Sequence, residues 1–115
     1  MLTMRKRKAE REPCALVLAL KKLGGWKLLV LRELCKQPRR FSDFKKLLPV
    51  ISSTSLARTL KALEDDAFIV RNVVQTRPLV VSYSLEIDEP LLREVIESLT
   101  RFGKRYAQRR LPSSS

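Results

Sequence analysis

The apolar residues of the chain first recur at helical spacing and later alternate, which predicts a helical part followed by a β-hairpin. A first helix is predicted from Pro13 to Leu23, and Gly24-Gly25 then breaks the pattern, with Gly24 expected as a left-handed cap. The next stretch, from Trp26 to Cys35, is apolar on nearly every side. It therefore predicts a central helix that is covered from several directions.

Two further helices joined by a tight connection predict a helix-turn-helix. The first is short because Pro49 ends it, and we expect Ser42 to be its N-cap. The second begins at Ser52 or Ser53, and its leucines at spacing i, i+4 and i+7 form a buried stripe. Polar and basic residues occupy the opposite face of this second helix.

After Asp66 the apolar pattern changes to a partial alternation. Residues 68–74 and 80–85 are rich in β-branched side chains, and residues 75–79 between them are polar and contain a proline. This pattern predicts a hairpin with a basic tip directly after the helix-turn-helix, which is the order of a winged helix. We therefore expect an α+β, mostly helical fold: a winged helix-turn-helix with a two-stranded wing.

A last helix is predicted over about residues 88–110, with apolar residues in alternating steps of three and four. Such a heptad-like seam, late in a small domain, faces a partner subunit more often than its own core. The expected organisation is a basic N-terminal arm over 1–12, one domain over 13–110 and a disordered tail over 111–115.

The charge of the chain points to a polyanionic partner. Lys and Arg number 24 and Asp and Glu 12, so the net charge is 24 − 12 = +12. The excess is concentrated in residues 1–11 (five bases, one acid), 36–61 (seven bases, one acid) and 101–110 (five bases, no acid). This clustering favours one binding face over the alternative, a generally basic, solvated surface of a thermostable protein.

Composition also excludes several classes of function. The chain has no histidine and only three glycines, so histidine-dependent catalysis and phosphate-binding glycine loops are ruled out. Cys14 and Cys35 lie 21 residues apart with no ligand cluster around them, and we expect neither a metal nor a cofactor, nor an enzyme. No apolar run approaches ~18 residues and no signal peptide is evident, which predicts a cytoplasmic protein without membrane contact.

The span from Cys14 to about Phe102 resembles the HxlR-type, MarR-like winged helix-turn-helix regulators of bacteria and archaea. The matching strings are Pro13-Cys14, GWKLLVLREL at 25–34, RRFSDFKKLLPVIS at 39–52, LARTLKALEDDAFIVR at 56–71 and YSL at 83–85. Two positions depart from the family pattern, because Gly25 replaces its lysine before the tryptophan and Pro13 precedes Cys14 instead of following it. The resemblance implies a DNA-binding homodimer with contacts from the first and last helices. The expected interface residues are Leu16, Leu20, Leu92, Val95, Leu99, Phe102 and Tyr106.

In such a protein the first turns of the recognition helix approach base edges in the major groove. Arg58 suits guanine O6 and N7, and Arg77 at the hairpin tip suits the minor groove or the backbone. Arg39, Arg40, Lys45 and Lys46 resemble phosphate positioners. An ordinary solvated surface is the alternative for all of these residues. The predicted DNA-binding set is Arg39, Arg40, Lys45, Ser52, Ser53, Thr54, Ser55, Arg58, Thr59, Lys61, Gln75, Thr76 and Arg77.

Cys14 is the one candidate redox sensor, since some family members use an N-terminal cysteine as a switch and Lys21 and Lys22 are near enough in sequence to favour a thiolate. A buried apolar role at the dimer interface is the interpretation we favour for Cys14. We expect Cys35 and Trp26 to be core residues.

The predicted function is sequence-specific transcriptional regulation by a homodimer on a pseudo-palindromic operator. Its partners are double-stranded DNA and a second copy, with a small-molecule or redox effector left open. One alternative is a basic, chromatin-like protein that binds nucleic acid without sequence preference. Another is a winged helix used for protein assembly, against which the polar recognition face argues.

Overall fold

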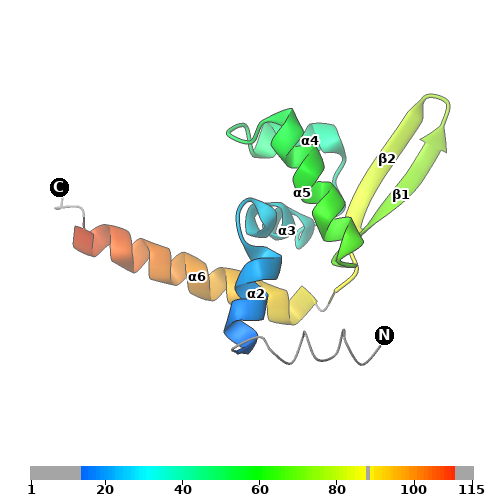
Figure 1. Ribbon diagram of the computed structural model, residues 1–115. Helices are drawn as coiled ribbons and strands as arrows, with labels where there is room; N and C mark the ends of the chain where they lie inside the picture. Colours follow the sequence, from blue (N-terminus) through cyan, green and yellow to red (C-terminus); the bar gives the residue numbers. More distant parts are fainter. Residues whose placement is uncertain (1–13, 88, 111–115) are drawn as a thin grey trace, which may run out of the picture.

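The computed structural model describes residues 14–87 and 89–110; the predicted arm at 1–12 and tail at 111–115 lie outside these residues. The described part folds into five helices and a two-stranded antiparallel sheet, which confirms the α+β winged helix-turn-helix (Figure 1). The elements are α2 (Ala15–Leu23), α3 (Lys27–Leu34), α4 (Phe41–Leu47), α5 (Ser53–Asp65), β1 (Ile69–Thr76), β2 (Leu79–Leu85) and α6 (Glu89–Arg110).

Helix α3 forms the centre of the fold, as its apolar sequence predicts. Val30, Leu31 and Leu34 are buried because α2, α5, β2 and α6 all contact this helix. The remaining buried apolar residues are Phe44, Leu48, Ile51, Leu56, Leu60, Leu63, Ile69 and Leu92. The core therefore connects the helix-turn-helix to the first strand of the wing and to the start of α6.

The turn between α2 and α3 differs from two expectations. Gly25, with φ of 67°, takes the left-handed conformation, whereas Gly24 has φ of −71°. A glycine suits this position because residues with a Cβ atom are strained at positive φ. Trp26 is 38% exposed and lies outside the buried core, so the prediction that it anchors the core was wrong. It immediately precedes α3, in the exposed turn that begins at Gly24.

A buried carboxylate ties the central helix to the chain that leads into α4. Glu33 is 3% exposed, and its oxygens lie 2.9 Å from Arg32 Nη2, 3.5 Å from Lys36 Nζ and 3.5 Å from Arg39 Nη2. Arg39 Nε also donates a hydrogen bond to the Glu33 carbonyl oxygen at 3.2 Å. A buried carboxylate needs such partners, because its desolvation is otherwise unfavourable by several kcal/mol.

The wing is longer than the sequence pattern predicts. Gln75 and Thr76 belong to β1 and Leu79 to β2, so Arg77 and Pro78 alone form the turn. The register pairs Ile69 with Leu85, and a bulge interrupts it between Val73 and Gln75. Only the base of the hairpin reaches the core, since Ile69 is buried and the rest of β1 is largely exposed.

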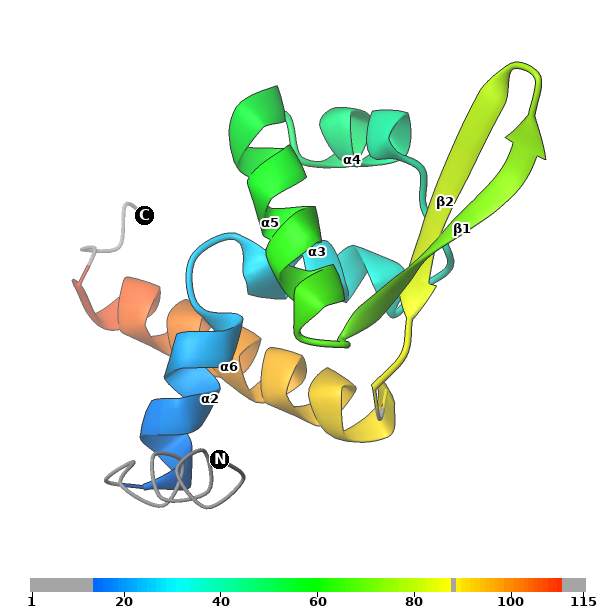
Figure 2. The same cartoon turned by 45° about the vertical axis from the view of Figure 1, so that its right-hand side comes forward.

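Helix α6 changes its environment along its length (Figures 1 and 2). Leu92, at the end of its first turn, is 4% exposed and belongs to the core of its own protomer. The prediction that Leu92 contacts a partner was therefore wrong, because the first turns of α6 pack over α3. Farther along, α6 runs clear of the body of the molecule. None of the helices described here combines the length and apolar character needed to span a bilayer.

Candidate nucleic-acid interface

Helix α5 presents a polar face whose first turns are exposed. The Ser52 hydroxyl caps the helix by accepting a hydrogen bond from the Ser55 amide at 3.1 Å, so Ser52 is the N-cap. Ser53, Thr54 and Arg58 are exposed, whereas the leucines of the predicted stripe are buried on the opposite side. Arg58 has no hydrogen bond or ion pair within the described part of the chain, so its guanidinium is available to an outside ligand.

Three other residues of the predicted α5 set have different environments. Thr59 is 9% exposed, and its hydroxyl donates to the Ser55 carbonyl at 2.8 Å. Thr59 is thus not a DNA contact, because it lies beside the buried stripe and Ser55 itself is half-buried. Lys61 is exposed and pairs with Asp65 at 2.9 Å, and this hydrogen bond raises the pKa of the lysine.

The structure separates the two adjacent arginines before α4. Arg39 has a side chain that is only 13% exposed and that is held by Glu33, while its backbone bridges to Tyr83 of β2. The prediction that Arg39 positions phosphate was therefore wrong. Arg40 is exposed, and its N–H donates to the Asp43 carboxylate at 2.8 Å. Arg40 is thus the N-cap of α4, and the prediction that Ser42 caps this helix was wrong.

Lys45 also serves the fold instead of the surface. Its Nζ donates to the Ile51 carbonyl oxygen at 2.8 Å, across the connection between α4 and α5. The lysine is half-buried and stabilises the turn between the two helices. The prediction that Lys45 contacts phosphate was therefore wrong. Lys46, the next residue, is exposed at the last turn of α4.

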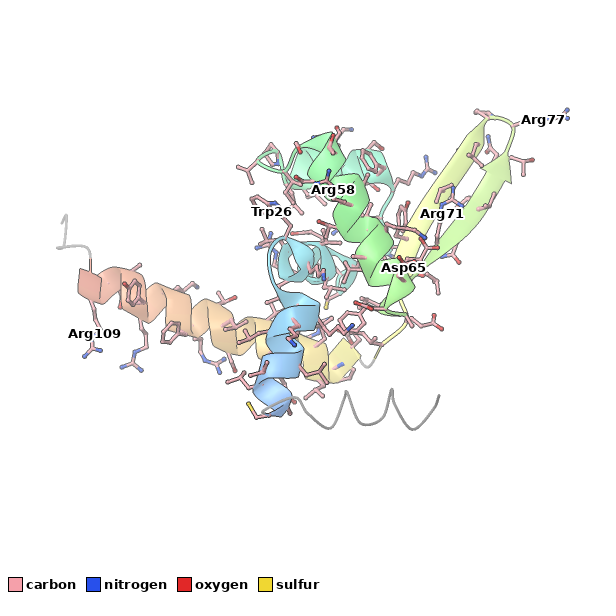
Figure 3. All side chains as sticks on the ribbon, in the orientation of Figure 1. Trp26, Arg58, Asp65, Arg71, Arg77 and Arg109 are labelled. Atoms are coloured by element: carbon pink, nitrogen blue, oxygen red, sulfur yellow. The ribbon has the colours of Figure 1, made fainter. Side chains whose placement is uncertain are left out.

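The tip of the wing carries an exposed arginine on a braced turn. Gln75 Nε2 donates to the carbonyl oxygens of Arg77 and Pro78 at 3.2 and 3.3 Å, so the amide stabilises the turn. Arg77 projects from the tip and Thr76 is exposed beside it (Figure 3). Arg71, exposed farther down β1, extends the basic surface and was not in the predicted set. Its sequence signal was weak, because one cation in a β-branched run is common on a solvated strand.

These groups lie on one side of the molecule. Figure 3 shows Arg58 on α5 and Arg77 on the wing at the top of the view, with α2 and α6 at the bottom. A shallow hollow between α4 and the wing is lined by Arg40, Phe41, Ser42, Leu79, Val80, Val81 and Tyr83. A helix with a free arginine beside a basic hairpin can engage a duplex along two neighbouring grooves.

The other side carries an uncovered apolar surface. A groove between α2, α3 and α6 is lined by Leu16, Ala19, Leu20, Leu23, Leu28, Leu91, Glu94, Val95, Ser98 and Leu99. Leu16 and Leu20 are exposed, as are Leu99, Phe102 and Tyr106 on α6, while Val95 is half-buried. The Phe102 and Tyr106 rings stack at 6.3 Å between centroids. Of the predicted interface residues, Leu16, Leu20, Val95 and Leu99 thus line one groove, and Phe102 and Tyr106 continue the Leu99 stripe farther along α6.

The two cysteines differ in exposure. Cys14 is exposed and directly precedes α2, so the expectation of a buried cysteine does not hold for the single protomer. Lys21 and Lys22 lie in the last turn of α2, about 10–12 Å along the helix from Cys14 by the rise of 1.5 Å per residue, and Lys22 pairs with Asp66. They therefore do not stand beside the thiol. Cys35 is half-buried against the core, and this burial raises its pKa.

Across residues 14–87 and 89–110, acidic and cysteine side chains nowhere form a cluster that could hold a metal ion.

Comparisons with known proteins agree with this geometry. The family model described as HxlR-like helix-turn-helix matches residues 22–111. The chain is 35% identical over 99 residues to the HTH-type transcriptional regulator YdeP of Bacillus subtilis, an alignment covering 85% of this chain and 77% of YdeP.

Two solved regulators share the fold. The redox regulator HypR in its reduced form is 25% identical, with a TM-score of 0.75 over 83% of this chain and 95% of HypR. The reduced form of the transcriptional regulator YodB from B. subtilis is 28% identical, with a TM-score of 0.69 over 83% of this chain and 95% of YodB. Because the family model spans most of the chain and the fold agrees, the protein belongs to the HxlR-like helix-turn-helix family of transcriptional regulators.

Proposed function

We propose that the protein acts as a homodimer on a pseudo-palindromic operator, with α5 of each copy in the major groove and each wing at an adjacent minor groove. The observation that carries this proposal is the separation of two surfaces. Arg58 and Arg77 share one side of the molecule, whereas the apolar surface of α2 and α6 lies on the other. Two copies joined through the apolar surface keep both recognition helices free for DNA.

The start of α5 supports close approach to base edges. Ser53 and Thr54 are small and exposed, so they leave room for the helix to enter a groove. Arg58, one turn farther in, has five donors and no internal partner, which suits bidentate bonding to guanine. Arg40, Lys46 and Arg71 then supply phosphate contacts that orient the helix.

Replacement of Arg58 by Ala tests whether sequence is read directly. We expect a loss of roughly 1–3 kcal/mol on a duplex selected by repeated enrichment from random sequence, and little loss on unselected duplex. The matched control is Lys61→Ala on the same helix face. Because the Lys61 ammonium group already pairs with Asp65, we expect this variant to lose less affinity for the selected duplex than Arg58→Ala. Fluorescence anisotropy on both duplexes measures the effect.

Equal losses for Arg58→Ala on the two duplexes would contradict direct readout. They would instead favour the alternative, a basic winged-helix protein without sequence preference, which the net charge of +12 also permits.

We further propose that Cys14 is a thiol through which oxidants weaken operator binding. Its exposure beside the dimerisation surface supports this role, as does the likeness to HypR, a redox regulator, and to YodB, solved also after diamide treatment. Diamide would take two electrons and two protons from two thiols, which then form one disulfide, here between Cys14 of two copies or between Cys14 and a small thiol.

Treatment of the wild type with diamide should lower operator affinity about fivefold or more, the scale of an allosteric coupling. Cys14→Ser should remove this response and keep basal binding. Cys35→Ser is the control that should keep the response. Burial raises the pKa of the Cys35 thiol, so a smaller fraction of it is the reactive thiolate. A wild type whose binding ignores diamide would show Cys14 to be structural.

A further inference from the structure

The second half of α6 has the least balanced charge of the described elements. Residues 98–109 contain Arg101, Lys104, Arg105 and Arg109 and no acidic residue. All four cations are exposed, and Figures 1 and 2 show this half of the helix projecting away from the other elements. Arg109 lies near its far end in Figure 3, on the side opposite to Arg58 and Arg77.

These cations differ from the cations that the fold neutralises. Glu33 is surrounded by three cations, and Lys22, Lys61 and Arg93 each pair with a carboxylate. None of the four cations on the second half of α6 forms an ion pair with a described residue, and Arg101 donates only to the Ser98 hydroxyl at 3.1 Å. Their positive charge is therefore uncompensated within the described protomer.

Arg105 and Arg109 lie beside the rings of Phe102 and Tyr106, and Arg109 is in the last turn of the helix. Two ordinary explanations do not account for the other two cations, Arg101 and Lys104. The helix dipole favours cations only in the last turn, whereas Arg101 and Lys104 lie six to nine residues before the end of α6 at Arg110. Dimerisation does not need them either. At about 100° per residue, Arg101 and Lys104 point away from the stripe of Leu99, Phe102 and Tyr106, so a second copy on that stripe leaves them in solvent.

We propose that the face of α6 that carries Arg101 and Lys104 binds the phosphate backbone of a second duplex, so that one operator-bound dimer bridges two DNA segments. The inference rests on the proposed DNA binding through α5. Arg101 and Lys104 are about 4.5 Å apart along the helix axis, and duplex DNA carries about one negative charge per 1.7 Å of its axis, so both cations can meet phosphates of one duplex. The nearby hydroxyls are already engaged within the helix, since Thr100 donates to the Ile96 carbonyl oxygen and Ser98 accepts from Arg101. Phosphate contacts carry no sequence information, so this binding is independent of sequence.

A sandwich assay tests the proposal on the whole chain. Protein is bound to the selected duplex on beads, unbound protein is washed away, and retention of a fluorescent duplex of unrelated sequence is measured over a salt series. The wild type should retain the second duplex at low salt. Arg101→Gln combined with Lys104→Gln should lower retention at least fivefold and reduce the log–log salt slope by about 2. Operator affinity should stay within about twofold of the wild type, because these two residues lie away from α5.

Lys21→Gln combined with Lys27→Gln is the matched control, since it removes the same charge from α2 and α3 and should preserve retention. Wild-type retention by the double α6 variant would overturn the proposal, as would absence of retention by the wild type. An α6 variant that becomes monomeric in light scattering would also overturn it, because its cations would then pair with acids of the second copy. An equal loss of operator affinity would assign the cations to the first duplex. Failure of the wild type to bind any selected duplex would instead overturn the proposed function itself.

Discussion

Replacing Leu99 by Lys is expected to convert the proposed dimer into folded monomers. Leu99 is 50% exposed and lines the groove between α2 and α6, so it contributes little to the core of one protomer. Fully burying a leucine contributes about 1.5–3 kcal/mol, and a two-fold interface buries each residue twice. The loss, together with the unfavourable burial of an ammonium group, should weaken association at least 100-fold, which is about 2.8 kcal/mol.

Light scattering at micromolar concentration measures this change, and circular dichroism verifies that the variant stays folded. Thr100→Lys introduces the same charge one residue farther along, on a different side of α6, and should remain dimeric. A wild type that is monomeric under these conditions would contradict the proposed dimer. Association of Leu99→Lys as strong as that of the wild type would contradict the proposed interface.

Arg39→Ala should unfold the protein more readily, with a loss of about 3 kcal/mol in the free energy of unfolding. Removing one partner from a buried ion pair typically lowers stability by about 3–5 kcal/mol, because the remaining charge stays desolvated. Glu33 keeps Arg32 and Lys36, whose side chains are about half exposed, so the lower end of that range applies. Chemical denaturation with a constant m-value measures the difference.

The neighbouring Arg40→Ala is the control for this variant. Arg40 is exposed and has no described carboxylate against its guanidinium, so stability should change by less than about 0.5 kcal/mol. Instead, the salt slope of DNA binding should fall by about 1, as expected for one phosphate contact. The opposite pattern, a stable Arg39→Ala with a reduced salt slope, would restore Arg39 to the DNA interface.

The periodicity of the chain was sufficient to predict the order of the elements, because it depends on local rules. Pro49 and the Ser52 cap mark the boundary between α4 and α5, and the leucine spacing in α5 determines which face is buried. The change to β-branched residues after Asp66 predicted the wing. The exposed face of α5, with Thr54 and Arg58, follows from the same period. Each of these features arises within a few residues of sequence.

Tertiary structure alone decided between residues that are alike in sequence. Arg39 and Arg40 are adjacent arginines, yet only Arg39 meets Glu33, because the approach of α3 to this segment creates a buried carboxylate there. Leu92 and Leu99 share one helical stripe, yet α3 covers the first and leaves the second at the surface. Burial is set by what packs against a residue from distant parts of the chain. The sequence pattern by itself determined which face of each element is apolar, and the packing determined which part of that face remained for a partner.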